Sequence, residues 1–155
     1  MTIGDICMGK EAIMTIDCKR YSENIEDIID LLARSGWKYY GAEKKIEYLP
    51  LGDGDDYNWQ KNSISAEKLR KLIGKKQVNN EVVGLVMYKE NSDEGITILA
   101  KNTKEITFCL DINRKTVSNN REAITDVGWY FTNILQRLDE KGCSADYIKF
   151  EEYID

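Results

Sequence analysis

Three apolar segments follow one another in the middle of the chain, and the links between them are too short to hold a helix. The segments cover residues 81–89, 96–100 and 105–112. The links, at 90–95 and 101–104, are rich in residues such as Asn, Ser, Asp and Gly, which favour turns. Strands joined by such short links run antiparallel as neighbours. The sequence therefore predicts a three-stranded meander, which any fold of this chain must contain.

Hydrophobic periodicity predicts further helices and strands on both sides of this meander. Apolar residues recur at helical spacing over 23–35, where Ser22 is placed to cap the helix and Gly36 to end it. The other predicted elements are a strand over 11–18, extended structure over 37–48 broken at Gly41, a helix over 66–74 capped by Ser63 or Ser65, a helix over 123–141 and a strand over 146–154. The apolar stripe of the last helix is Ile124, Val127, Phe131, Ile134, Leu135 and Leu138.

Together these elements predict a single α+β domain over residues 1–155, with 1–10 as a flexible extension. Their order is β-α-β-α-β-β-β-α-β, and the strands include a consecutive block. We therefore expect a mainly antiparallel sheet of about five to six strands, packed with three helices on one or both faces. A chain of 155 residues can bury enough apolar surface to hold one core without disulfides or metals.

The chain contains no histidine, the commonest general acid/base and metal ligand at neutral pH. None of the common catalytic or phosphate-binding motifs occurs. The acidic loop departs from the EF-hand pattern at Asn58 and Ile64, and the four cysteines form no C-x-x-C pair. We therefore expect no enzyme activity, no cofactor and no metal. The enzyme alternative that stays open is a carboxylate pair, such as Asp53 with Glu152.

The charge balance of the chain bears on its partners. Asp and Glu number 27 and Lys and Arg 22, which gives a net charge of −5. This charge argues against binding to nucleic acid or anionic lipid, and it suits a basic partner. No run approaches the ~20 apolar residues of a membrane span. We expect a cytoplasmic protein with reduced thiols, in which Cys18 and Cys109 are small core residues.

The strongest candidate for a binding site is the acidic and aromatic loop over 53–59. Its candidate residues are Asp53, Asp55, Asp56, Tyr57 and Trp59. Carboxylates this close repel one another unless a cation or a basic partner relieves them, and the rings add rigid contact area. We expect this loop to bind a basic protein surface. The alternative is a solvated turn, because Asp and Gly are recruited to turns for backbone reasons alone.

The predicted C-terminal strand offers weaker candidates, Glu151 and Glu152. If Ile148 and Phe150 point inward, then Tyr147, Lys149, Glu151 and Tyr153 share the outward face. These residues could extend the same binding surface, or they could protect a sheet edge from aggregation. Between residues 61 and 76 six basic residues accompany one Glu, and we interpret this stretch as a solvated helix face.

A small, acidic, histidine-free α+β domain with carboxylates flanked by Tyr and Trp resembles bacterial immunity proteins. The likeness is to those of contact-dependent growth inhibition and related polymorphic toxin systems, and it covers the chain in size, charge and element order. It implies a cytoplasmic protein that binds its cognate toxin, often a nuclease, and covers the basic active cleft. A different alternative is a regulatory or adaptor domain that binds a peptide or small ligand beside Trp129, Tyr130 or Phe131.

Overall fold

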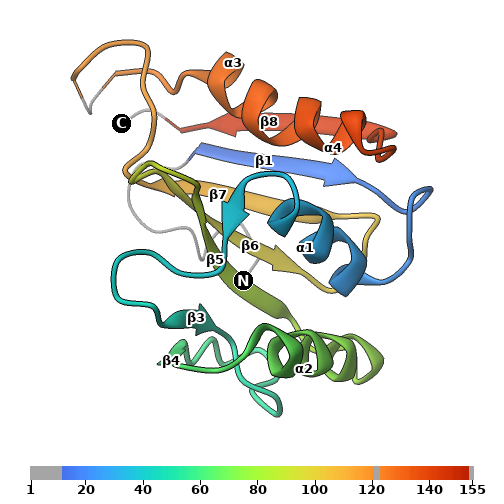
Figure 1. The fold of residues 1–155 in the computed structure, drawn as a ribbon. Helices are drawn as coiled ribbons and strands as arrows, with labels where there is room; N and C mark the ends of the chain where they lie inside the picture. The colour runs from blue at the N-terminus through green and yellow to red at the C-terminus, as the bar shows by residue number, and fades with distance from the viewer. Residues whose placement is uncertain (1–11, 121–122, 154–155) are drawn as a thin grey trace.

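In the computed structural model, which describes residues 12–120 and 123–153, eight strands form one sheet and helices cover it (Figure 1). The strands are β1 Ala12–Asp17, β2 Trp37–Lys38, β3 Ile46–Tyr48, β4 Gln60–Asn62, β5 Val83–Lys89, β6 Gly95–Ala100, β7 Ile106–Ile112 and β8 Tyr147–Glu152. The helices are α1 Ile25–Ala33, α2 Ala66–Val78 and a C-terminal helix in which α3 Val127–Tyr130, the π-helical η2 Phe131–Gln136 and α4 Arg137–Glu140 follow directly. The predicted α+β class is confirmed, with more strands than expected. The prediction for residues 1–10 lies outside the described residues.

The strand order is β4-β3-β5-β6-β7-β1-β8, with β2 pairing β5 beside β3. The predicted meander is confirmed, because β5, β6 and β7 are antiparallel neighbours. The first strand lies between β7 and the last strand: Ile16 of β1 is opposite both Ile106 and Ile148. The two edge strands of the sheet are therefore β8 and the short strand β4.

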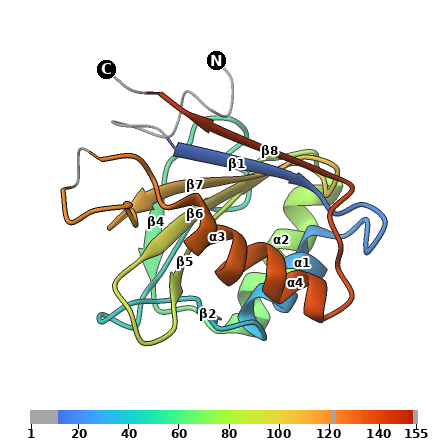
Figure 2. The ribbon, with the colours of Figure 1, turned by 90° about the horizontal axis from the view of Figure 1, so that it is seen from above.

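All the helices of residues 12–120 and 123–153 pack on one face of the sheet, and none of them covers the opposite face, here called the helix-free face (Figure 2). Strand alternation divides the residues between them. Met14 and Phe108 belong to the large core beneath the helices, whereas Ile13 and Cys109 belong to a smaller cluster on the helix-free face. We expected helices on one face of the sheet or on both, and the structure shows them on one face.

Several predicted helix boundaries need correction: α1 covers Ile25–Ala33 and is shorter than predicted at both ends. The N-cap of α1 is Asn24 instead of Ser22, which lies two residues before it; the Ser22 hydroxyl donates to Asp27 (2.6 Å) and accepts from the Asn24 N–H (3.0 Å). α2 begins as predicted, with the Ser65 hydroxyl accepting from the Lys68 N–H (3.1 Å). It continues to Val78, four residues past the predicted end.

The C-terminal helix begins at Val127, later than predicted, and the Asp126 side chain caps it by accepting from the Trp129 N–H. The predicted stripe is wrong at Ile124 and Phe131, which are 56% and 39% exposed. Tyr130 is buried instead. The π-helical turn of η2 shifts which residues face the core, a shift that ideal α-helical spacing does not anticipate.

The cysteines fall into two groups. Cys18 and Cys109 are buried, as predicted, and Cys18 and Cys143 are free thiols. Cys109 is disulfide-bonded, so the expectation of reduced thiols is wrong for this residue.

Candidate functional site

The acidic loop is attached to the helix-free face through its aromatic residues. Tyr57 and Trp59 are half-buried and pack against the small cluster of that face, which consists of Ile13, Leu49, Val82, Leu99 and Cys109. Trp59 lies directly over Gly84 of β5, where a Cβ atom would approach the edge of the indole ring to 2.9 Å. The rings therefore fix the loop to the sheet and present only part of their surface to a partner.

The base of the loop is held by buried polar contacts. The Lys76 ammonium is fully buried, donates to the Pro50 carbonyl (2.6 Å) and pairs with Glu81 (3.2 Å). The same Glu81 carboxylate accepts from the Gly52 N–H (2.9 Å). Lys76 is thus part of the loop's support, and it does not belong to the solvated basic face predicted for residues 61–76.

The three loop aspartates have different roles. Asp53 is buried, and its carboxylate accepts from the Asn58 N–H (3.1 Å), which closes the loop on itself. Asp55 and Asp56 are exposed. Asp55 lies 3.5 Å from the Lys101 ammonium, an exposed pair of small energetic value. Asp55 and Asp56 are therefore the loop carboxylates that a partner can reach.

Beside Trp59 the helix-free face is hollowed by about 250 Å³, and two further carboxylates, Glu47 and Asp111, line this hollow. The surrounding protein raises the pKa of Asp111 by withdrawing water from its carboxylate. The Thr97 hydroxyl, which donates to that carboxylate (3.1 Å), opposes the shift, and the charge of Glu47 adds to it. Neither residue was predicted from the sequence. The alternation of β7, which puts Thr107, Cys109 and Asp111 on one face, indicates the position of Asp111.

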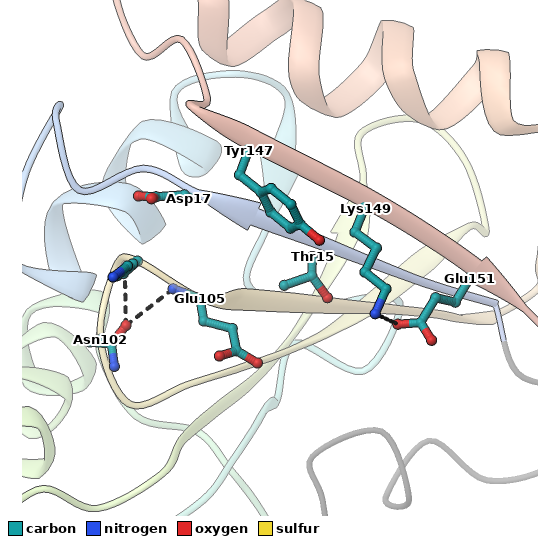
Figure 3. A pocket seen from close by; sticks show the side chains of 8 residues that line it. Thr15, Asp17, Asn102, Glu105, Tyr147, Lys149 and Glu151 are labelled. Atoms are coloured by element: carbon teal, nitrogen blue, oxygen red, sulfur yellow. Dashed lines mark hydrogen bonds and ion pairs between the residues drawn. The ribbon is translucent and has the colours of Figure 1, made fainter.

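A second hollow of about 590 Å³ lies on the same face between β1, β8 and the turn after β6 (Figure 3). Its lining includes Thr15, Asp17, Asn102, Lys104, Glu105, Tyr147, Lys149 and Glu151. Glu151 accepts from the Tyr153 hydroxyl (2.7 Å) and pairs with Lys149 (3.2 Å). These two contacts, the hydroxyl first, lower the pKa of Glu151. Asp17 and Glu105 add acidic charge to the hollow.

Glu152 points to the other side of the sheet. Its carboxylate pairs with Arg114 (3.1 Å) and accepts from the Thr125 N–H (3.1 Å), so it ties the segment after β7 to the last strand. The structure therefore places Glu151 on the helix-free face and uses Glu152 internally. The turn after β6 joins the two acidic regions, because Lys101 pairs with Asp55 while the next residue, Asn102, lines the hollow beside β8.

Two other hypotheses from the sequence concern a ligand site beside Trp129 and Tyr130 and a catalytic pair of carboxylates. Trp129 packs edge-on against both Trp37 (6.4 Å between ring centroids) and Tyr130 (4.9 Å), so these rings fill the space beneath the helix. Asp53, proposed with Glu152 as a catalytic pair, belongs to the loop between β3 and β4, at the sheet edge opposite β8.

Three of the exposed basic residues of 61–76 face acidic neighbours on the protein itself. Lys61 pairs with Glu43 (2.8 Å), Lys71 with Glu67 (3.4 Å) and Arg70 with Asp30 (3.9 Å). The positive charge of this region is thus partly neutralised within the chain.

Two further observations bear on the kind of site. Residues 12–120 and 123–153 contain no group of three or more Cys, Asp or Glu residues that could hold a metal ion. Of the helices described, none has both the length and the apolar character needed to cross a bilayer.

Comparison with known proteins found no matching protein family, no similar curated protein and no similar solved structure.

Proposed function

We propose that this protein is an immunity protein, a stoichiometric inhibitor that binds a basic bacterial toxin of the nuclease class through its helix-free face. The observation that carries the proposal is the set of carboxylates around half-buried rings on that face. Asp56, Glu105 and Asp111 form no ion pair with any described residue. Asp111 lines the hollow beside Trp59, Glu105 lines the hollow beside β8, and Asp56 is an exposed residue of the loop that carries Trp59.

The electrostatics of the hollow beside Trp59 favour a cationic partner. Desolvation by the surrounding protein is the main cause of the raised pKa of Asp111, and the charge of the nearby Glu47 adds to it, so the two carboxylates repel each other when both are ionised. An Arg or Lys side chain placed between them would relieve this repulsion and gain charge-assisted hydrogen bonds. A nuclease cleft carries such side chains because it holds a polyphosphate, so the acidic face would compete with the substrate for the same residues.

The exposed loop carboxylates and the anchored rings serve different stages of such a complex. Asp55 and Asp56 project from the loop, where charge steers diffusional encounter and raises the association rate. Trp59 and Tyr57 present flat, rigid surface beside them, the kind of residue that dominates interface energies once the complex has formed. No bond-breaking step is assigned to any residue.

The test is neutralisation of a nuclease domain, and the probe is any such domain that the genome encodes beside this protein's gene. We expect the wild-type chain to bind that domain at one-to-one stoichiometry and to block its nuclease activity. The double variant Asp55→Lys and Asp56→Lys should slow association by about tenfold or more at low salt and flatten its salt dependence. Reversal of Glu90 and Glu140 changes the net charge equally at exposed positions away from this face, and should leave most of the rate intact.

Two results would contradict parts of the proposal. Equal loss of binding in both double variants would mean that net charge matters and the loop does not. Turnover of a substrate that disappears in an Asp111→Asn variant, with no binding to the toxin domain, would replace the inhibitor by a carboxylate enzyme.

A further inference from the structure

The last strand of the sheet has an edge that no strand of the described residues covers. β8 pairs antiparallel with β1 along its whole length, from Ala12 opposite Glu152 to Asp17 opposite Tyr147. The strand order ends at β8 (Figure 1). Such an edge presents backbone N–H and C=O groups that can pair with a further strand, and proteins normally cover or blunt it.

The side chains of β8 divide between the two faces. Tyr147, Lys149 and Glu151 lie together on the helix-free face (Figure 3). Ile148 and Phe150 point to the opposite face, where Ile148 is 45% exposed although it is apolar. The β8 edge therefore carries Lys149, Glu151 and Tyr147 on one face, and Ile148, Phe150 and the internally paired Glu152 on the other.

We propose that this edge binds β8 of a second copy of the chain, so that two sheets join across a twofold axis at Phe150. An antiparallel pair centred there places Lys149 opposite Glu151 of the second copy, and the symmetry repeats the contact. Tyr147 then lies opposite Tyr153 of the second copy. Opposite charges and aromatic pairs at directly opposed positions stabilise strand pairing, and an interface of this kind uses the same patch on both subunits.

The charges also exclude the neighbouring registers. In an antiparallel pair, directly opposed residues lie on the same face of the sheet. If both helix layers are to stay on one side, the twofold axis must therefore pass through a residue of β8, and the nearest alternative registers are one residue away. Centring it on Lys149 brings the two lysines together, and centring it on Glu151 brings the two glutamates together. Only the Phe150-centred register turns both charges of each strand into attractive contacts.

The same charges favour a second copy over a strand from a basic partner. A basic strand would place positive charge against Lys149, whereas a second copy places Glu151 there. Beside the strand, the C-terminal helix runs along β8 (Figure 1). A six-residue strand pair alone buries less than a standard interface of about 1,200–2,000 Å², so we expect a reversible dimer.

The experiment is sedimentation velocity of the full chain over a wide range of concentrations, without any toxin. We expect a monomer–dimer equilibrium. K149E and E151K should each weaken the dimer about tenfold, because both charge pairs become repulsive. The double variant K149E/E151K should restore it, since the charges are exchanged but remain opposite. An equimolar mixture of the K149E and E151K chains should form a heterodimer more readily than either chain forms a homodimer.

K38E serves as the matched control, because Lys38 is exposed on β2 and forms no described ion pair, and it should dimerise like the wild type. A chain that stays monomeric at every concentration would overturn the inference. So would single variants that dimerise as well as the wild type. Both readouts are independent of toxin binding, so the dimer and the proposed function can fail separately.

Discussion

Replacing Gly84 by Ala tests how the acidic loop is fixed to the sheet. Gly84 is buried on the helix-free face of β5, beneath Leu49 and Trp59. A Cβ atom at this position would lie 2.5 Å from Cδ1 and 2.6 Å from Cγ of Leu49, and 2.9 Å from Cη2 of Trp59. All three distances are shorter than van der Waals contact, and Leu49 has no exposed surface into which it could move.

The expected magnitude follows from two opposing terms. Extra volume in a packed region costs about 1–3 kcal/mol. Loss of glycine's conformational freedom in the unfolded chain returns about 0.5–1 kcal/mol. Their difference spans about 0–2.5 kcal/mol, and because the fully buried Leu49 cannot move out of the way, we expect Gly84→Ala to lower the free energy of unfolding by about 1–2 kcal/mol. For a domain of this size, that corresponds to a decrease in Tm of roughly 2–8 °C.

The assay is urea and thermal unfolding followed by tryptophan fluorescence, which also reports on Trp59. Gly128→Ala is the matched control, since the nearest atom to its Cβ is Oδ1 of Asp126 at 3.6 Å and the residue lies in a helix. That substitution should be neutral or stabilising by up to about 1 kcal/mol. A Gly84→Ala protein as stable as the wild type, with unchanged emission, would refute the close contact between loop and strand.

Three other predictions concern buried polar contacts. Lys76→Met should lower stability by about 1–3 kcal/mol in urea unfolding, because it leaves the Pro50 carbonyl without its buried donor. Burial of Glu81 disfavours its charge, but contacts from the Gly52 N–H and Lys76 outweigh this and lower its pKa. Its stabilisation is therefore complete above the ordinary Glu pKa of about 4.3 and disappears as the pH falls through the lower folded value, more steeply in the wild type than in Lys76→Met. Glu152→Ala should speed amide hydrogen exchange at Thr125, and unchanged exchange there would mean that this tether is not needed.

The main elements of the fold could be predicted because their signals are local. The meander, β1 and α1 each show a regular apolar pattern within a few residues, and turn chemistry separates them. Gln60–Asn62 and Trp37–Lys38 are too short for any such pattern, and β4 is polar and exposed throughout. The placement of β1 between β7 and β8 depends on pairings between distant segments, which no single-sequence pattern contains.

The candidate site could be predicted only in part, for the same reason. The concentration of Asp and aromatic residues in one loop is visible in the sequence, and so is the alternation that separates Glu151 from Glu152. The Asp53 carboxylate is directed into the loop by the Asn58 N–H, which donates to it. The Glu152 carboxylate is held inside the protein by Arg114 and the Thr125 N–H. A carboxylate's role is set by the donors around it, and these are known only once the chain is folded.

The anchoring of the loop has a consequence for binding as well as for stability. Lys76, Glu81 and the ring of Trp59 hold the loop at its base, so Asp55 and Asp56 project from a support that is already ordered. An ordered loop loses little conformational entropy when it meets a partner, and this raises affinity without any new contact. Gly84→Ala should therefore weaken toxin binding as well as folding, although Gly84 lies beneath the loop and out of a partner's reach. If the variant bound the toxin as tightly as the wild type despite its lower stability, the position of Trp59 would not matter to the complex.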